Sequence, residues 1–262
     1  MTIPIYLQPN FNFLETAGVT DVANTITRLK SQALLLGWTN PVGDTIVCPA
    51  NSVGQQITVA FSRISATNIQ MVVTDSLSRT CTRRCQTAAT FVERIYFNTF
   101  GFFFDPGNSE GLWFSLLDLS PDLQNSHDQF ATGHGTRNSS DSADVTMSVM
   151  ASMQLNSASP RVYTATAITT WMPRGSLDTG SNQKFSQSGS RMWYPLVHVG
   201  PTASSTVIRI RGRVFQALLV PSTETAQSEF TVPLDQATTG LFKVLSWAAS
   251  ANAGFVLAVR KA

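Results

Sequence analysis

The chain has 262 residues, and charged residues make up only 13% of them, about half of the roughly 25% in an average soluble domain. The 18 basic and 16 acidic residues nearly cancel, which argues against nucleic acid bound across the whole surface. The missing charge is replaced by 30 threonines and 28 serines. A hydrophobic content of 43% excludes a disordered chain, because burying that much apolar surface offsets the entropy lost on folding.

No apolar run approaches the roughly 18 residues of a membrane-spanning helix, so we expect no membrane partner. The first nine residues carry no basic cluster and are interrupted by two prolines, so we expect no secretory signal peptide. The cysteines are too few, and odd in number, for a disulfide framework. We therefore expect the three cysteines to be free thiols in a reducing compartment: Cys48, Cys81 and Cys85.

A helix is predicted near the N-terminus. Its apolar residues recur at four-three-four-three spacing and form one stripe: Val22, Ile26, Leu29, Ala33 and Leu36. Thr20 or Asp21 can cap the start, and Gly37 can follow the last turn. A single apolar stripe has to be buried against another element, so we expect this amphipathic helix to pack on the strands that follow.

After the predicted helix, the apolar period changes to 2, which is typical of antiparallel strands with one solvated face. Three such segments predict a β-meander: 57–61, 69–73 and 91–97. In the third segment, Glu93 shares a face with the apolar residues. The run Phe102 to Phe104 ends in a turn at Pro106 and Gly107. Residues 111–119 fit either a short helix or a buried strand.

Residues 136–144 contain no apolar residue except Ala143 and are the predicted linker or exposed loop. They separate a helix-plus-meander domain, 1–135, from a β-sandwich part, 145–262, which either stands alone or belongs to the same sheet system. Further strands are predicted at 145–155, 161–171, 192–199, 206–220, 229–232, 241–247 and 255–260. The predicted fold is mainly β: an antiparallel β-sandwich or barrel-like sheets with the N-terminal amphipathic helix packed on the sheet.

Residue spacing gives little support to a metal or catalytic site. His127 and His134 are seven residues apart, which fits neither a zinc protease nor a zinc finger. We predict no nucleophile elbow and no phosphate loop, and therefore no enzyme activity, catalytic residue, metal, other cofactor or small-molecule substrate. The polar segment is instead a candidate binding loop with His127, His134, Arg137 and Asn138, unless its histidines only hydrogen-bond to the backbone.

Three arginines alternate with Ile208, Ile210 and Gly212 in the segment 207–214. In a strand, Arg209, Arg211 and Arg213 share one face, where they repel each other unless they meet carboxylates, phosphates or carbonyl groups. They form a candidate contact strip for a neighbouring subunit or a nucleic-acid backbone. The alternative is a solvated edge strand, whose charges prevent aggregation.

Several short segments resemble structural proteins of tailed bacteriophages. These segments span residues 20 to 140: 26–39, 49–54, 57–64, 117–121 and 133–137. The resemblance implies a virion component of the neck, collar, tail or baseplate that is present in several copies. It also implies assembly in the host cytoplasm and supplies no catalytic residues.

Composition and resemblance lead to one hypothesis. Neutral hydroxyl and apolar surface costs less to desolvate than ionised side chains, which suits a surface covered by neighbours. We therefore expect a non-enzymatic virion protein whose partners are other copies of itself and neighbouring virion proteins. The alternative is a β-sandwich receptor- or glycan-binding module that uses the loops 136–144 and 173–190.

Overall fold

The protein is mainly β, as the sequence predicts. The computed structural model describes residues 12–40, 42–50, 56–74, 78, 80–107, 111–119, 130–134, 150–154, 161–164, 167–170, 194–202, 205–221, 224–233, 239–246 and 255–262. Within these ranges there are seventeen strands, in one sheet of four and one of thirteen, and one helix. All pairs of strands are antiparallel except β9 with β10, so the predicted antiparallel architecture is confirmed.

The helix α1 (Val22–Leu35) has the predicted cap and buried stripe. The Asp21 carboxylate accepts a hydrogen bond from Asn24 N at 2.9 Å, which satisfies one of the otherwise unpaired amides of the first turn. Gly37 follows the helix with a φ of +84°, the left-handed conformation that favours glycine at this position. The buried residues are Val22, Thr25, Ile26, Leu29 and Ala33. They pack against β6 of the large sheet and against β2 and β3 of the small one.

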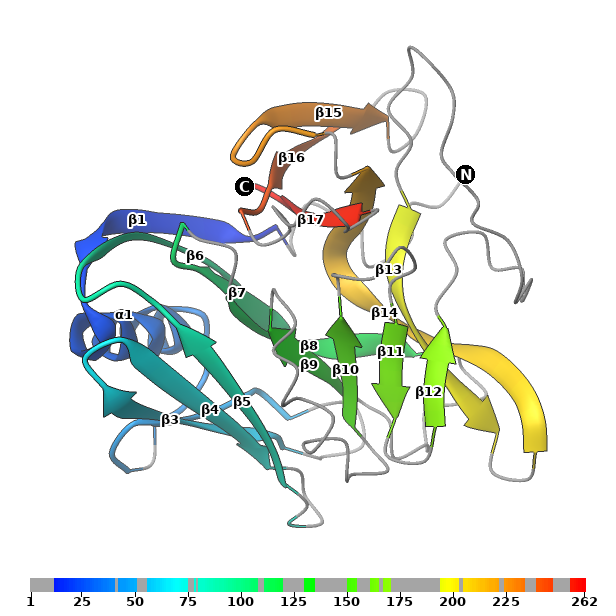
Figure 1. Cartoon of the computed structure of the whole chain (residues 1–262), viewed down its shortest axis with the longest axis horizontal. Coiled ribbons are helices and arrows are strands. Elements are labelled where there is room, and N and C mark those ends of the chain that lie inside the picture. The colour runs from blue at the N-terminus through cyan, green and yellow to red at the C-terminus, as the bar shows by residue number, and fades with distance from the viewer. Residues whose placement is uncertain are drawn as a thin grey trace.

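The small sheet contains β2 (Thr45–Val47), β3 (Thr58–Ser65), β4 (Asn68–Thr74) and β5 (Thr80–Gln86), paired in that order. Every second residue is buried in β4 and in the first half of β3, so one face of this sheet is apolar there. In Figure 1 the sheet lies at the same end of the molecule as α1.

The large sheet begins with β1, which pairs with β6 along its whole length. Its central path runs β12-β11-β10-β9-β8-β14-β17-β16-β15. The bounds are β1 Leu14–Thr20, β6 Phe91–Asn98, β7 Gly101–Asp105, β8 Leu112–Leu119, β9 Phe130–His134, β10 Met150–Gln154, β11 Arg161–Thr164, β12 Ala167–Thr170, β13 Tyr194–Thr202, β14 Ser205–Pro221, β15 Glu229–Pro233, β16 Thr239–Val244 and β17 Phe255–Arg260.

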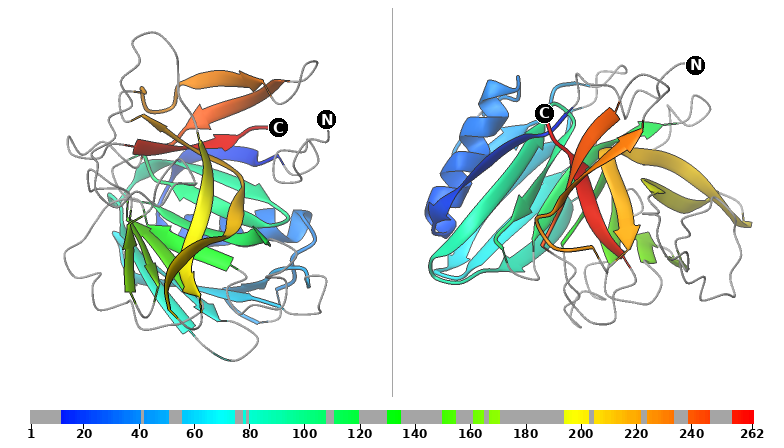
Figure 2. Two further views of the ribbon diagram at one scale, coloured as in Figure 1. Left: turned by 90° about the vertical axis from the view of Figure 1, so that its right-hand side faces the viewer. Right: turned by 90° about the horizontal axis from the view of Figure 1, so that it is seen from above.

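The seventeen-residue strand β14 changes partner along its length. Residues 212–214 pair with β8, and residues 217–221 pair with β17. Gln216 lies between the two pairings with a φ of +57°, a left-handed conformation that is uncommon outside glycine. Such a residue bends a strand, so the C-terminal strands leave the plane of β8 at this point. Figure 2 shows β15 to β17 lying over β1 and β6 on one side, with the small sheet on the other.

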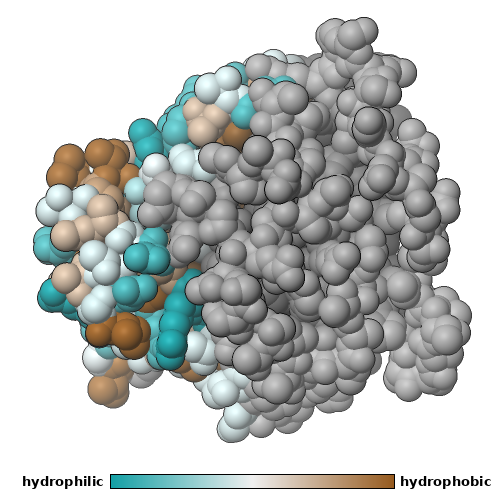
Figure 3. Space-filling model, viewed as in Figure 1, coloured by the Kyte–Doolittle hydropathy of each residue, from teal (hydrophilic) through white to brown (hydrophobic). Residues whose placement is uncertain are grey.

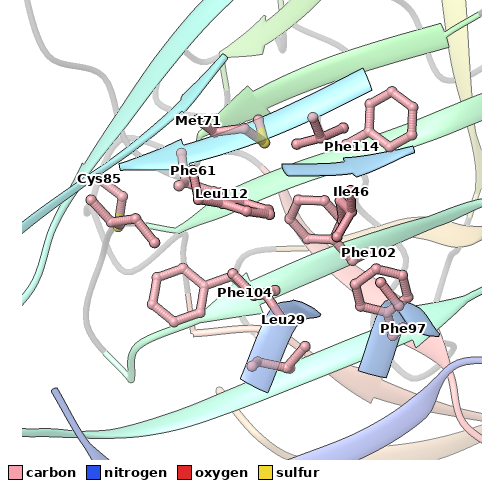
Figure 4. Close-up of a cluster of buried hydrophobic side chains, with 14 of the residues drawn as sticks. Leu29, Ile46, Phe61, Met71, Cys85, Phe97, Phe102, Phe104, Leu112 and Phe114 are labelled. Carbon is pink, nitrogen blue, oxygen red and sulfur yellow. The ribbon is translucent and has the colours of Figure 1, made fainter. Parts of the chain in front are cut away.

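An aromatic core fills the space between the two sheets (Figure 4). Phe102, Phe104 and Phe114 of the large sheet face Phe61 and Met71 of the small one. The ring centroids of Phe61 and Phe102 are 5.7 Å apart, so the two layers are in direct contact. This interlayer contact is the defining feature of a β-sandwich.

The opposite face of β7 is buried as well. Phe103 stacks on Trp113 with 5.8 Å between the ring centroids, and the edge of Phe13 contacts Phe103 at 5.2 Å. Phe13 also joins the two ends of the described chain, because its amide donates to the Arg260 carbonyl at 2.9 Å. The N-terminal strand and the C-terminal strand are therefore held together on this second face.

Strands from both predicted domains belong to the large sheet, since β8 pairs directly with β14. The predicted linker, 136–144, lies outside the described residues, so the domain division stays a prediction. Four strands, β1, β2, β5 and β9, were not predicted, and the single strand expected at 161–171 is a hairpin of β11 and β12. Residues 111–119, for which the pattern left helix or strand open, form β8.

Gly101 begins β7 where the backbone of β8 approaches closely. A Cβ atom at this position would lie 2.2 Å from the Phe114 carbonyl oxygen and 2.7 Å from the Ser115 Cα. Backbone cannot move aside as a side chain can, so Gly101→Ala should lower the free energy of unfolding by about 3 kcal/mol in urea titrations. Thr99→Ala, in the same hairpin turn, adds no atoms and is the control. An unchanged midpoint for Gly101→Ala would contradict this packing.

Candidate functional site

The three arginines of the predicted contact strip lie in β14. Arg213 is paired in register with Asp118 of β8 and with Val197 of β13, so β14 is an inner strand at this point and not an edge strand. Arg211 is the additional residue at a register shift, because the neighbouring residues of β14 pair with consecutive residues of β13. This shift interrupts the strict alternation on which the prediction of one shared face depends. The strip as a contact surface stays a prediction.

The predicted binding loop is only partly covered by the structure. His134 is the last residue of β9 and is paired in register with Leu112 of β8. His127, Arg137 and Asn138 lie outside the described residues, as do the loops 136–144 and 173–190 of the alternative glycan-binding hypothesis.

A polar network lies between β1, β6 and β7 and the C-terminal strands. We call it the junction cluster, and its members are Glu15, Tyr96, Asp105, Gln227, Lys243, Ser246 and Lys261. At one end, the Glu15 carboxylate binds Lys243 Nζ at 2.5 Å and Lys261 Nζ at 2.9 Å. These ion pairs join residues more than 220 positions apart in the sequence.

The other end of the junction cluster is centred on Asp105. Its carboxylate accepts hydrogen bonds from the Gln227 side-chain amide at 2.7 Å and from the backbone amides of Ser246 and Gly107, both at 2.9 Å. The Tyr96 hydroxyl links the two ends, at 3.3 Å from Glu15 Oε1 and 3.4 Å from Gln227 Oε1. Both carboxylates of the cluster therefore have partners within the fold.

Burial and neighbouring charges shift the pKa values of these groups in different directions. Burial raises the pKa of Glu15, but hydrogen bonds from Lys243 and Lys261 and their positive charges outweigh it, so the pKa is lower than usual. The pKa of Asp105 is raised because burial exceeds the effect of its backbone donors. Burial, followed by the negative charges of Glu15 and Asp105, raises the pKa of Tyr96.

A second polar group, which we call the helix clamp, consists of Gly18, Thr25, Arg28 and Glu93. The Thr25 hydroxyl donates to one oxygen of the buried Glu93 carboxylate, and Arg28 Nη1 binds the other at 2.7 Å. Gly18 is paired in register with Glu93, and a Cβ there would lie 2.8 Å from Arg28 Nη1. The glycine thus leaves room for the guanidinium to reach Glu93. Burial raises the pKa of Glu93 despite these partners.

Arg79, Arg83 and Arg84 are close together in the sequence, but the two that lie in β5 do not form a basic patch. Arg83 is buried and donates to the Thr82 carbonyl, whereas Arg84 is exposed and donates to the Gln70 side chain. Neighbouring residues of a strand face opposite sides, which explains the difference. Arg79 lies outside the described residues.

Cys48 and Cys85 are both buried thiols, and burial raises the pKa of Cys48 to about 11. A thiol with a raised pKa is a poor nucleophile at neutral pH. Within the described residues no three His, Cys, Asp or Glu side chains are grouped so that they could hold a metal. The helix in this part of the chain is not long and apolar enough to cross a membrane.

One sequence match was missed. Residues 107–111 read Gly-Asn-Ser-Glu-Gly, which has the Gly-x-Ser-x-Gly spacing of a nucleophile elbow. The segment connects β7 to β8, two strands, whereas an elbow connects a strand to a helix. Ser109 itself lies outside the described residues, so the match carries no assignment.

The junction cluster was not predicted either, because its members are ordinary polar residues scattered from position 15 to position 261. Of the residues in the two polar groups, only Glu93 stood out in the sequence, because it shares a strand face with the apolar residues Phe91, Ile95 and Phe97. The arrangement of both polar groups is suited to holding strands and helix in place. Their carboxylates are already bonded to lysine, arginine, hydroxyl and amide donors of the same chain.

Glu15→Gln should lower the free energy of unfolding by about 2 kcal/mol at pH 7, the scale of hydrogen bonds to charged groups. Because the folded-state pKa of Glu15 is lowered, its contribution is present above the unfolded-state pKa and is lost as pH falls through the folded-state value. The difference between wild type and variant should therefore disappear in acid. Urea titrations across the acidic range measure it, and a pH-independent difference would contradict the ion pairs.

Glu93→Gln is predicted to show the opposite pH dependence. The raised pKa of Glu93 means that the folded state binds the proton more tightly, so its contribution is greatest at low pH and is lost as pH rises through the folded-state pKa. The stability of wild type relative to this variant should fall from acid to neutral pH. The Glu15 variant is the matched comparison. If the stability difference from wild type changed with pH in the same direction for both variants, the environment described for one of the two carboxylates would be incorrect.

The chain matches none of the models of known protein families, and no curated protein sequence matches it significantly. The likeness to phage structural proteins therefore rests on the short sequence segments alone. A function for this chain has to be argued from its composition, its fold and its surface.

Proposed function

We propose that this protein is a non-enzymatic structural subunit of a bacteriophage virion, in the neck, collar, tail or baseplate. It assembles in multiple copies in the host cytoplasm and is held in the particle by contacts with copies of itself and neighbouring virion proteins. The observation that carries the proposal is a set of strongly exposed large apolar side chains at the end of the molecule that carries α1. Leu35 is 76% exposed, Val42 78% and Val19 72%.

These side chains form two groups. Leu34 and Leu35 end α1, and Val42 follows in the loop that the Lys30–Asp44 ion pair, at 3.1 Å, ties back to the helix. Val19 and Val92 are exposed partners in the register of β1 and β6. Figure 3 shows separate brown patches at this end of the molecule.

The exposed groups are separate from the core, since the buried stripe of α1 and the aromatic layer already cover each other. Apolar side chains that gather in an exposed patch and are not needed by the fold are typical of protein contact surfaces. Burying them against a neighbour releases water at little electrostatic cost, because the chain carries few charges to desolvate. The polar groups of the junction cluster and the helix clamp support the same function, because they stabilise the subunit itself.

The double variant Leu35→Ser, Val42→Ser should reduce self-association of the purified protein and its incorporation into particles at least several-fold. It should leave the melting temperature unchanged within about 2 °C, since both side chains are exposed. Light scattering after size exclusion and mass spectrometry of purified virions measure the two effects. Ala23→Ser, at an exposed position of the same helix, is the matched control.

Two results would overturn parts of the proposal. A wild-type protein that stays monomeric at every concentration and is absent from virions would remove the structural function. Normal assembly of the double variant would remove the α1 end as the contact surface.

A further inference from the structure

The strand β1 lies at an open edge of the large sheet. It pairs with β6 on one side, along its whole length and without a register shift. Within the described residues, only Phe13, just before β1, has a backbone partner on the other side. Its amide donates to the Arg260 carbonyl, and its carbonyl accepts from the Ala262 amide. From there to α1, β1 forms the upper border of the molecule in Figure 1.

The contact at Phe13 shows which backbone groups of β1 face the open side. The amide and carbonyl of Phe13 point away from β6, and successive residues of a strand direct these groups to opposite sides. The groups of Ala17 and Val19 therefore point outward as well, whereas those of Thr16 and Gly18 bond to β6. Within the described part of the chain, the outward groups of Ala17 and Val19 have no hydrogen-bond partner.

Two other edge strands, β15 and β2, have features that oppose the addition of a further strand. β15 begins with Glu229 and ends with Pro233, which has no amide to donate, and β2 has only three residues. β1 contains no proline, lysine or bulge. Its one charged residue, Glu15, is bound by Lys243 and Lys261. An edge of this kind is a template for pairing with another strand.

The side chains along this edge fit a second copy of β1. Two identical strands related by a two-fold axis through the sheet pair antiparallel, and an axis at Gly18 places Ala17 beside the partner's Val19. Each exposed Val19 then lies between Val92 of its own chain and the partner's Ala17, so apolar surface covers apolar surface. Gly18 has no side chain to crowd the axis. Residues 16–20 carry no charge, so no like charges meet in this register.

We propose that β1 pairs antiparallel with β1 of a second copy around an axis at Gly18, which joins two large sheets into one continuous sheet. The amides and carbonyls of Ala17 and Val19 form the new hydrogen bonds. This inference rests on the proposed function, because it names one contact of a subunit that is present in several copies. The overlap is short, so the dimer forms at high protein concentration, and further contacts strengthen it in the particle.

Hydrogen exchange of the full chain, followed for single amides by NMR, tests the backbone pairing. Raising the protein concentration should slow the exchange of the Ala17 and Val19 amides at least several-fold. The amides of Thr16 and Gly18 bond to β6 in monomer and dimer, so they should be slow at every concentration and are the internal control. Val19→Lys places a charge that opposes strand addition and should abolish the concentration dependence. Its melting temperature should stay within about 2 °C of wild type, because the side chain is exposed.

Cross-linking tests whether the added strand is β1 of a second copy. The proposed register places residue 17 of both copies on the same face and close to the axis. Ala17→Cys should therefore give several-fold more dimer with a short bismaleimide than Arg84→Cys, whose exposed position lies on the small sheet. Wild type measures the background from the native cysteines. Adding Val19→Lys to Ala17→Cys should remove the cross-link.

Fast exchange of the Ala17 and Val19 amides at every concentration, or equal cross-linking of Ala17→Cys and Arg84→Cys, would overturn the pairing. A protein that gives these results but is incorporated into virions keeps the proposed structural function and loses only the β1 contact. A protein that shows protection and the cross-link but is absent from virions keeps the β1 contact and loses the structural function.

Discussion

The structure depends on burying both faces of β7. This short strand has three consecutive phenylalanines, and adjacent side chains of a strand face opposite sides, so no single layer can cover them. Phe102 and Phe104 are covered by the small sheet, and Phe103 is covered by Trp113 and Phe13. The need to cover Phe103 explains why the N-terminal strand has to meet the C-terminal strands on the second face of the large sheet.

Polar groups determine how that second face closes. Apolar packing has no direction, whereas ion pairs and hydrogen bonds fix register and orientation. The junction cluster places β1 against the C-terminal strands through Glu15, and the helix clamp places α1 on β6 through Glu93. Burial disfavours the charged form of both carboxylates, but two lysines outweigh it at Glu15, whereas Thr25 and Arg28 do not outweigh it at Glu93.

The surface and the interior support different parts of the functional argument. The interior polar groups are occupied with stabilising the subunit, which agrees with a structural protein. The exposed apolar end around Leu35 and Val42 offers a contact for neighbours that the fold itself does not use.

The elements that depend on local periodicity could be predicted from the sequence. The stripe, cap and terminal glycine of α1 were predicted, as were the meander, the mainly β class and the placement of Glu93 on an apolar face. Nothing local marked β1, whose exposed and half-buried residues show no alternation, or the turn of β14 at Gln216. The contacts of Glu15 with Lys243 and Lys261, and the burial of Arg260, follow from the way distant strands pack together. These contacts join segments far apart in the chain, and their pairing follows from strand register, which no local pattern encodes.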